Sequence, residues 1–186
     1  MLFRSENQLL TPRAANLKVT LRTGSVGYDM NGIWRETTSR RYLGILLHVS
    51  NPLGAVGERV SAAENLIVSV DLQNNTGRTL LSAARSYWLG YEQNVLDLRP
   101  GEWGDALLGV IEFGTFVFYD NPNESAPVYI GRRPIPRSIR HPRRLGVFAL
   151  DGTLKLRARI ADVQLGETIY EYCASLPSNI PDSTGV

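Results

Sequence analysis

Three carboxylates that lie close together in the sequence are the first candidates for chemistry. Glu102, Asp105 and Glu112 fall within GEWGDALLGVIE, between Asp97 and Asp120. Paired carboxylates carry acid–base chemistry in glycosidases, and carboxylate oxygens bind calcium, although the closely alternating acids of a calcium loop are missing here. We interpret these residues as turn residues and as the solvent-facing side of a strand. A small β-sandwich hydrolase that uses them remains the weakest of three hypotheses.

The two histidines and the single cysteine add little chemistry. His48 lies in the apolar run LGILLHVSN and His141 lies among arginines, so the sequence predicts no multi-histidine metal site. The neighbouring positive charges favour the neutral form of His141. Cys173 has neither a base nor basic residues beside it in YEYCASL, which predicts a buried structural residue rather than a nucleophile. No phosphate-binding glycine loop is present, and the sequence predicts no enzyme and no cofactor.

Aromatic residues offer a second kind of site. Trp34, Trp88 and Trp103, with Tyr87 and Tyr91, could form a platform for a sugar ring. They belong to separate segments, so we favour packing in the core or at an interface. A carbohydrate-binding β-sandwich module is therefore the alternative function, and it predicts a monomer with one of these tryptophans exposed in a groove.

The segment GRRPIPRSIRHPRR, residues 131–144, concentrates positive charge. Its three prolines disfavour a helix and a central strand, so it is predicted to be an extended surface loop. Without its six arginines the formal charge of the chain is −4. We favour docking of this loop on an acidic surface of another copy, with nucleic acid as the second possible partner. The interface arginines are Arg132, Arg133, Arg137, Arg140, Arg143 and Arg144.

Alternating apolar and polar residues predict the strands that must position these groups. The pattern is clear at 17–22, 66–73 and 154–163, whereas the more continuous apolar runs at 42–50 and 107–119 predict strands covered on both faces. Turn residues occupy 74–77, 99–102, 120–124 and 149–154. Asp151-Gly152 predicts a hairpin, and short helices are conceivable at 61–66 or 78–88.

These elements predict an all-β protein, a two-sheet antiparallel sandwich of eight to ten strands, and within that class we favour a jelly roll. The length of 186 residues suits one domain, which we place at 16–175. We expect flexible arms at 1–15 and 176–186. The apolar residues of the first arm need burial on the core or on another subunit; they are Leu2, Phe3, Leu9 and Leu10.

Composition restricts the setting of the protein. One cysteine allows no intrachain disulfide, which favours a reducing compartment. The N-terminus lacks the long apolar core of a signal peptide. The longest apolar run, around 106–119, is too short and too interrupted for a membrane-spanning helix.

The strand series, the two arms and the arginine–proline loop resemble those of viral single-jelly-roll coat proteins of small icosahedral viruses and phages. The resemblance implies a virion structural protein: a capsid subunit, or a decoration, tail or connector component. It also implies a homo-oligomer that contacts other virion proteins, assembles in the host cytoplasm and has no catalytic activity. One feature departs from the pattern, because Arg4 and Arg13 are the only basic residues in the first fifteen, where many genome-packaging coat proteins are strongly basic.

Overall fold

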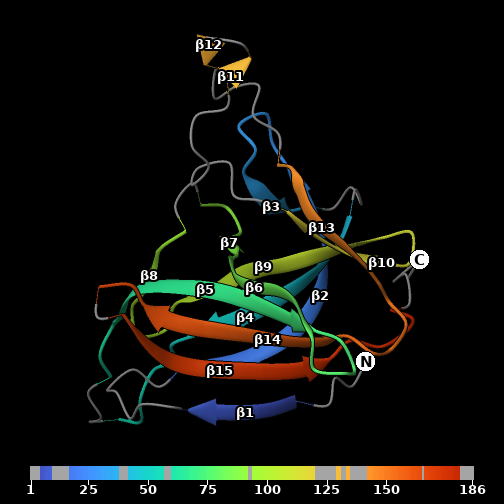
Figure 1. Ribbon diagram of the computed structural model, residues 1–186. Coiled ribbons are helices and arrows are strands. Elements are labelled where there is room, and N and C mark those ends of the chain that lie inside the picture. The colour runs from blue at the N-terminus through green and yellow to red at the C-terminus, as the bar shows by residue number, and fades with distance from the viewer. Residues whose placement is uncertain are drawn as a thin grey trace, which may run out of the picture.

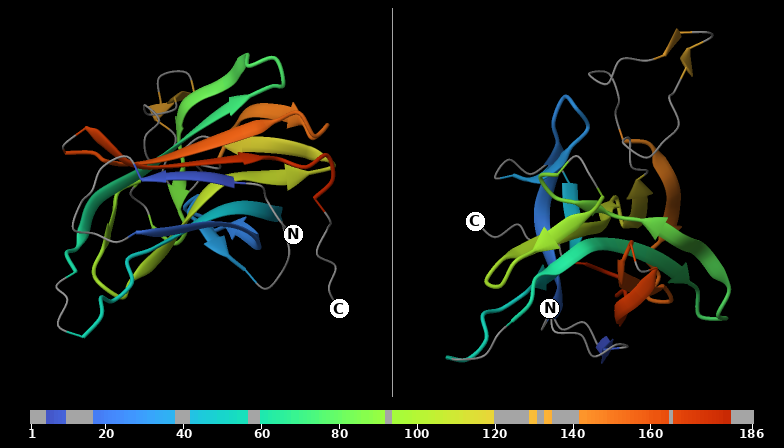
Figure 2. Two further views of the ribbon diagram at one scale, coloured as in Figure 1. Left: turned by 90° about the horizontal axis from the view of Figure 1, so that it is seen from below. Right: turned by 90° about the vertical axis from the view of Figure 1, so that its left-hand side faces the viewer.

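Two antiparallel β-sheets packed face to face form the body of the computed structural model (Figures 1 and 2). It describes residues 5–9, 17–37, 42–56, 60–91, 94–119, 129–130, 133–134, 142–164 and 166–180, and only the backbone of 5–9, 129–130 and 133–134. The described residues contain no helix, and therefore none long and apolar enough to cross a membrane. The prediction of an all-β sandwich is confirmed.

The first sheet has the strand order β1-β15-β14-β5-β6, and β8 also pairs with β5. Every described pairing in it is antiparallel. Its strands are β1 (Ser5–Leu9), β5 (Ala63–Gln73), β6 (Thr79–Arg85), β8 (Leu96–Leu98), β14 (Lys155–Asp162) and β15 (Glu167–Ser175).

The second sheet has the order β13-β10-β9-β4-β2-β3, and β7 also pairs with β9. Its strands are β2 (Lys18–Tyr28), β3 (Trp34–Glu36), β4 (Tyr42–Ser50), β7 (Tyr87–Trp88), β9 (Trp103–Glu112), β10 (Thr115–Tyr119) and β13 (Arg144–Ala149). A separate pair, β11 (Tyr129–Ile130) and β12 (Arg133–Pro134), stands apart from both sheets at the top of Figure 1.

The connections differ from the jelly roll that we favoured. Successive strands pair within one sheet at β2–β3, β5–β6, β9–β10 and β14–β15. In a jelly roll most successive strands instead alternate between the two sheets. The chain also passes from one sheet to the other between β1 and β2, β4 and β5, β6 and β7, β7 and β8, β8 and β9, and β13 and β14. The sandwich is thus built from hairpins, because the turn residues close local pairs.

The main core fills the space between the sheets. Inward residues of β5 and β14 meet those of β4 and β9, for example Val70 and Ile160 against Ile45 and Leu108, all fully buried. Burial of aliphatic side chains between two sheets is the main source of stability in such a sandwich.

A second apolar cluster lies on the outer face of the second sheet. Trp34 of β3 and Tyr87 of β7 cover Leu46 of β4 and Val110 of β9 there. The ring of Trp34 lies 5.2 Å from that of Tyr119, centroid to centroid. Strand β4 is therefore buried on both faces, as its continuous apolar sequence predicted.

Several local predictions were wrong because strand pairing is not local. Asp151-Gly152 forms a turn, but β13 before it belongs to the second sheet and β14 after it to the first, so the turn closes no hairpin. The run 107–119 is two strands, joined by a two-residue turn at Phe113-Gly114. The helices considered at 61–66 and 78–88 are absent, and these residues lie in or beside strands β5, β6 and β7.

Both predicted arms contact the sandwich in part. The backbone of residues 5–9 forms β1, which pairs with β15 at the edge of the first sheet. At the other end, Leu176 and Ile180 are buried in the main core, and the Leu176 N–H donates to the Leu154 carbonyl at 2.8 Å. The predicted flexible tail therefore cannot begin at 176. Residues 181–186 lie outside the described residues.

Candidate functional site

Strand β13 forms one edge of the second sheet and exposes apolar side chains. It pairs with β10 on one side and with no other described strand. Leu145 and Val147 are 58% and 55% exposed, whereas Gly146 and Phe148, which alternate with them, are half-buried. Phe113, at the tip of the adjacent β9–β10 hairpin, is fully exposed. This margin of the sheet is the first candidate for a functional surface.

A polar group anchors the start of β13. The Arg144 guanidinium donates to the Glu112 carboxylate, and the Tyr119 hydroxyl donates to the same carboxylate. Burial, together with the hydrogen bond to Glu112, raises the pKa of Tyr119 to about 12. Arg144, one of the arginines predicted to dock on a neighbour, is therefore held by a carboxylate of its own chain.

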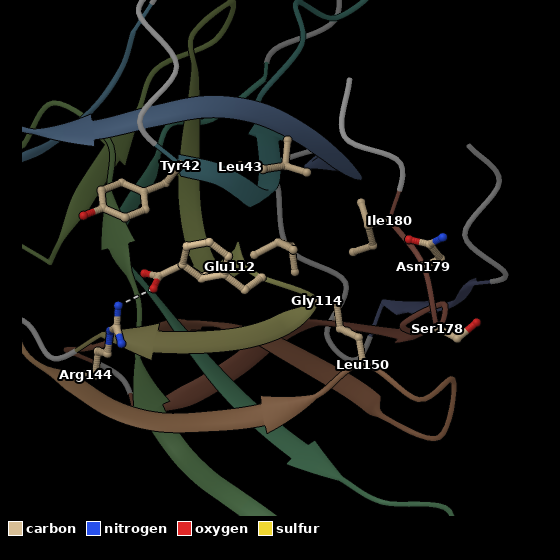
Figure 3. Close-up of a pocket in the computed structure, with 11 residues that line it drawn as sticks. Tyr42, Leu43, Glu112, Gly114, Arg144, Leu150, Ser178, Asn179 and Ile180 are labelled. Atoms are coloured by element: carbon tan, nitrogen blue, oxygen red, sulfur yellow. Dashed lines mark hydrogen bonds and ion pairs between the residues drawn. The ribbon is translucent and has the colours of Figure 1, made fainter. Parts of the chain in front are cut away.

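A pocket of about 620 Å³ opens beside this group, between the β9–β10 turn and residues 178–180. Figure 3 shows the Glu112–Arg144 ion pair at one end and Ser178 and Asn179 at the other. Its volume is in the usual range for small-molecule sites. Because Glu112 and Arg144 already pair with each other, neither charge is offered to a ligand, and the pocket indicates no particular class of ligand.

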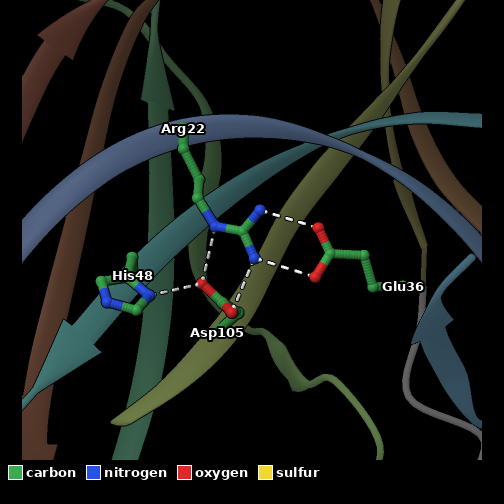
Figure 4. Close-up of polar contacts among 4 residues, drawn as sticks. All are labelled: Arg22, Glu36, His48 and Asp105. Carbon is green, nitrogen blue, oxygen red and sulfur yellow. Dashed lines mark hydrogen bonds and ion pairs between the residues drawn. The ribbon is translucent and has the colours of Figure 1, made fainter.

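A second polar group, the Asp105 cluster, lies on the outer face of the same sheet (Figure 4). Arg22 of β2 donates from Nε to Asp105 Oδ1 at 3.0 Å and from Nη2 to Oδ2 at 2.8 Å. The same guanidinium binds Glu36 of β3 through two contacts of 2.8 and 3.1 Å. His48 of β4 places Nδ1 3.0 Å from Asp105 Oδ1. Four side chains from four strands thus form one network.

The Asp105 cluster is held by burial and charge. The Asp105 side chain is only 3% exposed, so its negative charge needs the positive charge of Arg22. Hydrogen bonds to Glu36 and to Asp105 raise the pKa of Arg22, which keeps its guanidinium charged. The cross-strand register of β4 and β9 aligns His48 with Asp105. This alignment places both side chains on one face.

The Asp105–His48 pair resembles two members of a catalytic triad, but the third member is missing among the described residues. The one described hydrogen-bond partner of His48 is Asp105, and no hydroxyl or thiol among the described residues bonds to this imidazole. A nucleophile or a bound substrate would have to lie within hydrogen-bond reach. The geometry therefore shows a structural network with one imidazole edge half-exposed.

The three predicted carboxylates do not form a joint site. Asp105 belongs to the cluster above and Glu112 to the group at β13. The side chain of Glu102 accepts from the Arg99 N–H at 2.8 Å, in the turn before β9. Asp105 and Glu112 are seven residues apart along β9, about 23 Å at the rise of a strand. No group of three or more metal-ligating side chains occurs among the described residues.

The predicted aromatic platform is divided between the core and the surface. Trp34 and Trp88 are buried, each in a different apolar cluster. Trp103 is 59% exposed, and its ring centroid lies 5.4 Å from that of His48. Trp103, next to the Asp105 cluster, is the one of the three tryptophans that a ligand could reach, and Tyr91 is 47% exposed outside that cluster.

Most of the predicted interface residues lie outside the part of the chain with described side chains. Arg132, Arg137, Arg140 and His141 fall outside the described residues, and so do Leu2, Phe3 and Leu10. Only the backbone of Arg133 and Leu9 is described, in β12 and β1. Arg143 is exposed immediately before β13. The proposed docking role of the loop thus stays a prediction.

Cys173 lies on β15 and is half-buried. Burial is the main cause that raises the pKa of its thiol. A raised pKa lowers the thiolate fraction, so the structure gives this residue no nucleophilic character.

Sequence reasoning missed Arg22, Glu36, Leu145 and Val147. Arg22 and Asp105 are 83 residues apart, and a single sequence contains no signal for such a contact. The apolar residues of LGVFAL predicted a strand. Because they occur on both faces of that strand, they also indicated that its second face would be covered or would bind a partner. Comparisons with family models, with curated proteins and with solved structures find no match to this chain.

Proposed function

We propose that this chain is a structural subunit that acts by self-association, as a virion protein does: a capsid subunit, or a decoration, tail or connector component. The observation that carries the proposal is the edge of the second sheet at β13, which exposes apolar side chains and pairs with no described strand other than β10. Sheet edges with exposed apolar side chains and unpaired backbone groups bind other chains. A shell or filament subunit functions by binding its neighbours through such surfaces.

Two other described edges, β6 and β3, are more strongly protected than β13. Strand β6 is interrupted by two register shifts, and Ala83 within it has a φ of +49°. Strand β3 has three residues, of which Arg35 and Glu36 are charged. Bulges, shortness and charge all prevent strand addition. Strand β13 has six residues, and only the first of them, Arg144, is charged. Its pairing with β10 has one register shift, between Gly146 and Arg144, and is regular from Gly146 to Ala149.

The test is the size of the purified protein, measured by multi-angle light scattering at low and high salt over a range of concentrations. We expect an oligomer whose mass rises with concentration. The ratio of absorbance at 260 and 280 nm, read on the same peak, distinguishes the two partners considered for residues 131–144. A ratio typical of protein favours docking on another copy, whereas a high ratio that falls with salt favours nucleic acid. A monomer under all conditions contradicts the proposed function.

A second candidate is carbohydrate binding, which the exposed Trp103 beside His48 favours. Aromatic faces stack on sugar rings, and imidazole and carboxylate groups bind hydroxyls. Binding to a glycan array should then be lost in Trp103→Ala. The matched control is Tyr91→Ala, which removes another exposed aromatic side chain, 47% exposed, outside the Asp105 cluster. Equal binding by the two variants contradicts this candidate.

A further inference from the structure

We propose that β13 pairs with β13 of a second copy of this chain, antiparallel across a twofold axis at Val147. The second sheets of the two copies then form one continuous sheet. This inference rests on the proposed function, and it names the partner and the register of the interface.

The β9–β10 hairpin determines which backbone groups of β10 face β13. Its turn has two residues, Phe113 and Gly114, whose φ values of +47° and +73° suit a type I′ turn. In such a hairpin the residues that flank the turn, Glu112 and Thr115, are a hydrogen-bonded pair. The peptide groups of the next residue, Phe116, therefore point away from β9 and towards β13.

The same alternation leaves a row of backbone groups on β13 that pairs with no described strand. Phe116 lies opposite Phe148, and Phe118 lies opposite Gly146. Because Phe148 and Gly146 bond to β10, the N–H and C=O groups of Val147 and Ala149 point outwards from the sheet. A strand that joins this edge would bond to those two residues.

The sequence of β13 is complementary to itself in one register. With Val147 on the axis, Leu145 lies opposite the partner's Ala149, and Gly146 lies opposite the partner's Phe148. The exposed apolar side chains of both copies then meet on one face. On the opposite face, the ring of Phe148 in each copy covers Gly146 of the same chain.

Charge complements the pairing at its two ends. With Val147 on the axis, exposed Arg143 lies near the end of the partner's β13 that leads to exposed Asp151, although the register shift between Gly146 and Arg144 adds one residue there. The symmetry creates this approach of opposite charges twice, once at each end of the apolar centre.

The first experiment compares Val147→Lys with Val163→Lys by light scattering over a range of concentrations. Val147→Lys places two ammonium groups beside each other on the axis, which opposes pairing. Val163 is a matched control, because it is a partly exposed valine at the β14–β15 turn, away from β13. We expect the dissociation constant of the assembly to rise at least about tenfold in Val147→Lys and to change little in Val163→Lys. Thermal melts of both variants check that they fold.

The second experiment tests the register itself. Since Cys173 is the only cysteine, Cys173→Ser provides a background without thiols. In that background Val147→Cys should form a disulfide-linked dimer under mild copper–phenanthroline oxidation, because Cα atoms of hydrogen-bonded antiparallel pairs lie about 5.5 Å apart, within the roughly 4.4–6.8 Å of disulfides. Val163→Cys in the same background should stay monomeric on a non-reducing gel.

The outcomes separate this inference from the proposed function. An oligomer that dissociates in Val147→Lys, with a crosslink at residue 147, supports both. An oligomer that Val147→Lys leaves intact, or that gives no crosslink at 147, overturns the β13 pairing and leaves self-association standing. A wild-type protein that is monomeric at every concentration overturns both.

Discussion

Replacement of Asp105 by asparagine tests whether the Asp105 cluster is held by a buried charge. Asn keeps the size of the side chain and removes the charge that accepts from Arg22 and His48. Because the Asp105 side chain is 3% exposed, water cannot replace these contacts. Removal of one partner from a buried ion pair costs about 3–5 kcal/mol.

The structure indicates a smaller loss of stability for this pair. Arg22 keeps its two contacts to Glu36 and is one-third exposed, so its charge is not left uncompensated. We therefore expect Asp105→Asn to reduce the free energy of unfolding by about 2–3 kcal/mol, which corresponds to about 4–12 °C in Tm for a chain of this size. In contrast, Glu36→Gln removes a half-exposed partner and should cost less than about 1 kcal/mol.

The assay is urea unfolding at pH 7, followed by tryptophan fluorescence and checked by calorimetry. The matched control is Arg22→Leu combined with Asp105→Leu, which removes both charges. This double variant should be more stable than Asp105→Leu alone, since in the single variant the Arg22 guanidinium faces a leucine where Asp105 had been. The reasoning is refuted if Glu36→Gln costs as much as Asp105→Asn, because burial would then not determine the strength of the contacts.

Three further predictions concern packing and ionisation. An ideal Cβ at Gly109 would lie 2.3 Å from Cζ of buried Phe116. Gly109→Ala should therefore lower the free energy of unfolding, measured with urea, by about 1–3 kcal/mol. Adding Phe116→Leu to that variant should restore part of the lost stability. The pKa of Tyr119 is raised to about 12. Its neutral form therefore stabilises the fold fully below pH 10, and this contribution is lost as the pH rises towards 12. In thermal melts recorded from about pH 9 to 12, the Tm of Tyr119→Phe should fall less with pH than that of the wild type. Burial raises the pKa of Cys173. Iodoacetamide should therefore modify the folded protein at pH 8 more slowly than the urea-unfolded protein. Equal rates would contradict the half-buried position of this thiol.

Local patterns in the sequence were sufficient to predict the strands. The apolar run at 42–50 coincides with β4, and the alternation at 66–73 lies within β5. Both predictions depend on a periodicity of two, which the geometry of a strand imposes on neighbouring residues. Turn chemistry was equally local, since Asn74 accepts from the Thr76 and Arg78 N–H groups in the β5–β6 hairpin.

The arrangement of those strands could not be predicted from the same patterns. Asp151-Gly152 has the turn chemistry of a hairpin, yet buried Leu150 and Leu154 on either side of it fix the chain to the main core as it passes from one sheet to the other. The position of LGVFAL at a sheet edge, rather than at its centre, depends on pairing with β10. The Asp105 cluster also could not be predicted without the pairing of the strands, since four strands contribute to it.

The proposed β13 pairing also gives the arginine-rich segment a place to bind. In an antiparallel pair across the axis, residues 131–142 of each copy lead into the end of β13 that meets the partner's Asp151. The partner's β9–β10 turn lies next to that end, because the Leu150 N–H donates to the Gly114 carbonyl. The assembly should then have an apolar centre at Val147, insensitive to salt, and charged ends that weaken as salt rises. A dissociation constant that increases with salt in the wild type but hardly in Arg143→Gln would assign the salt dependence to these ends.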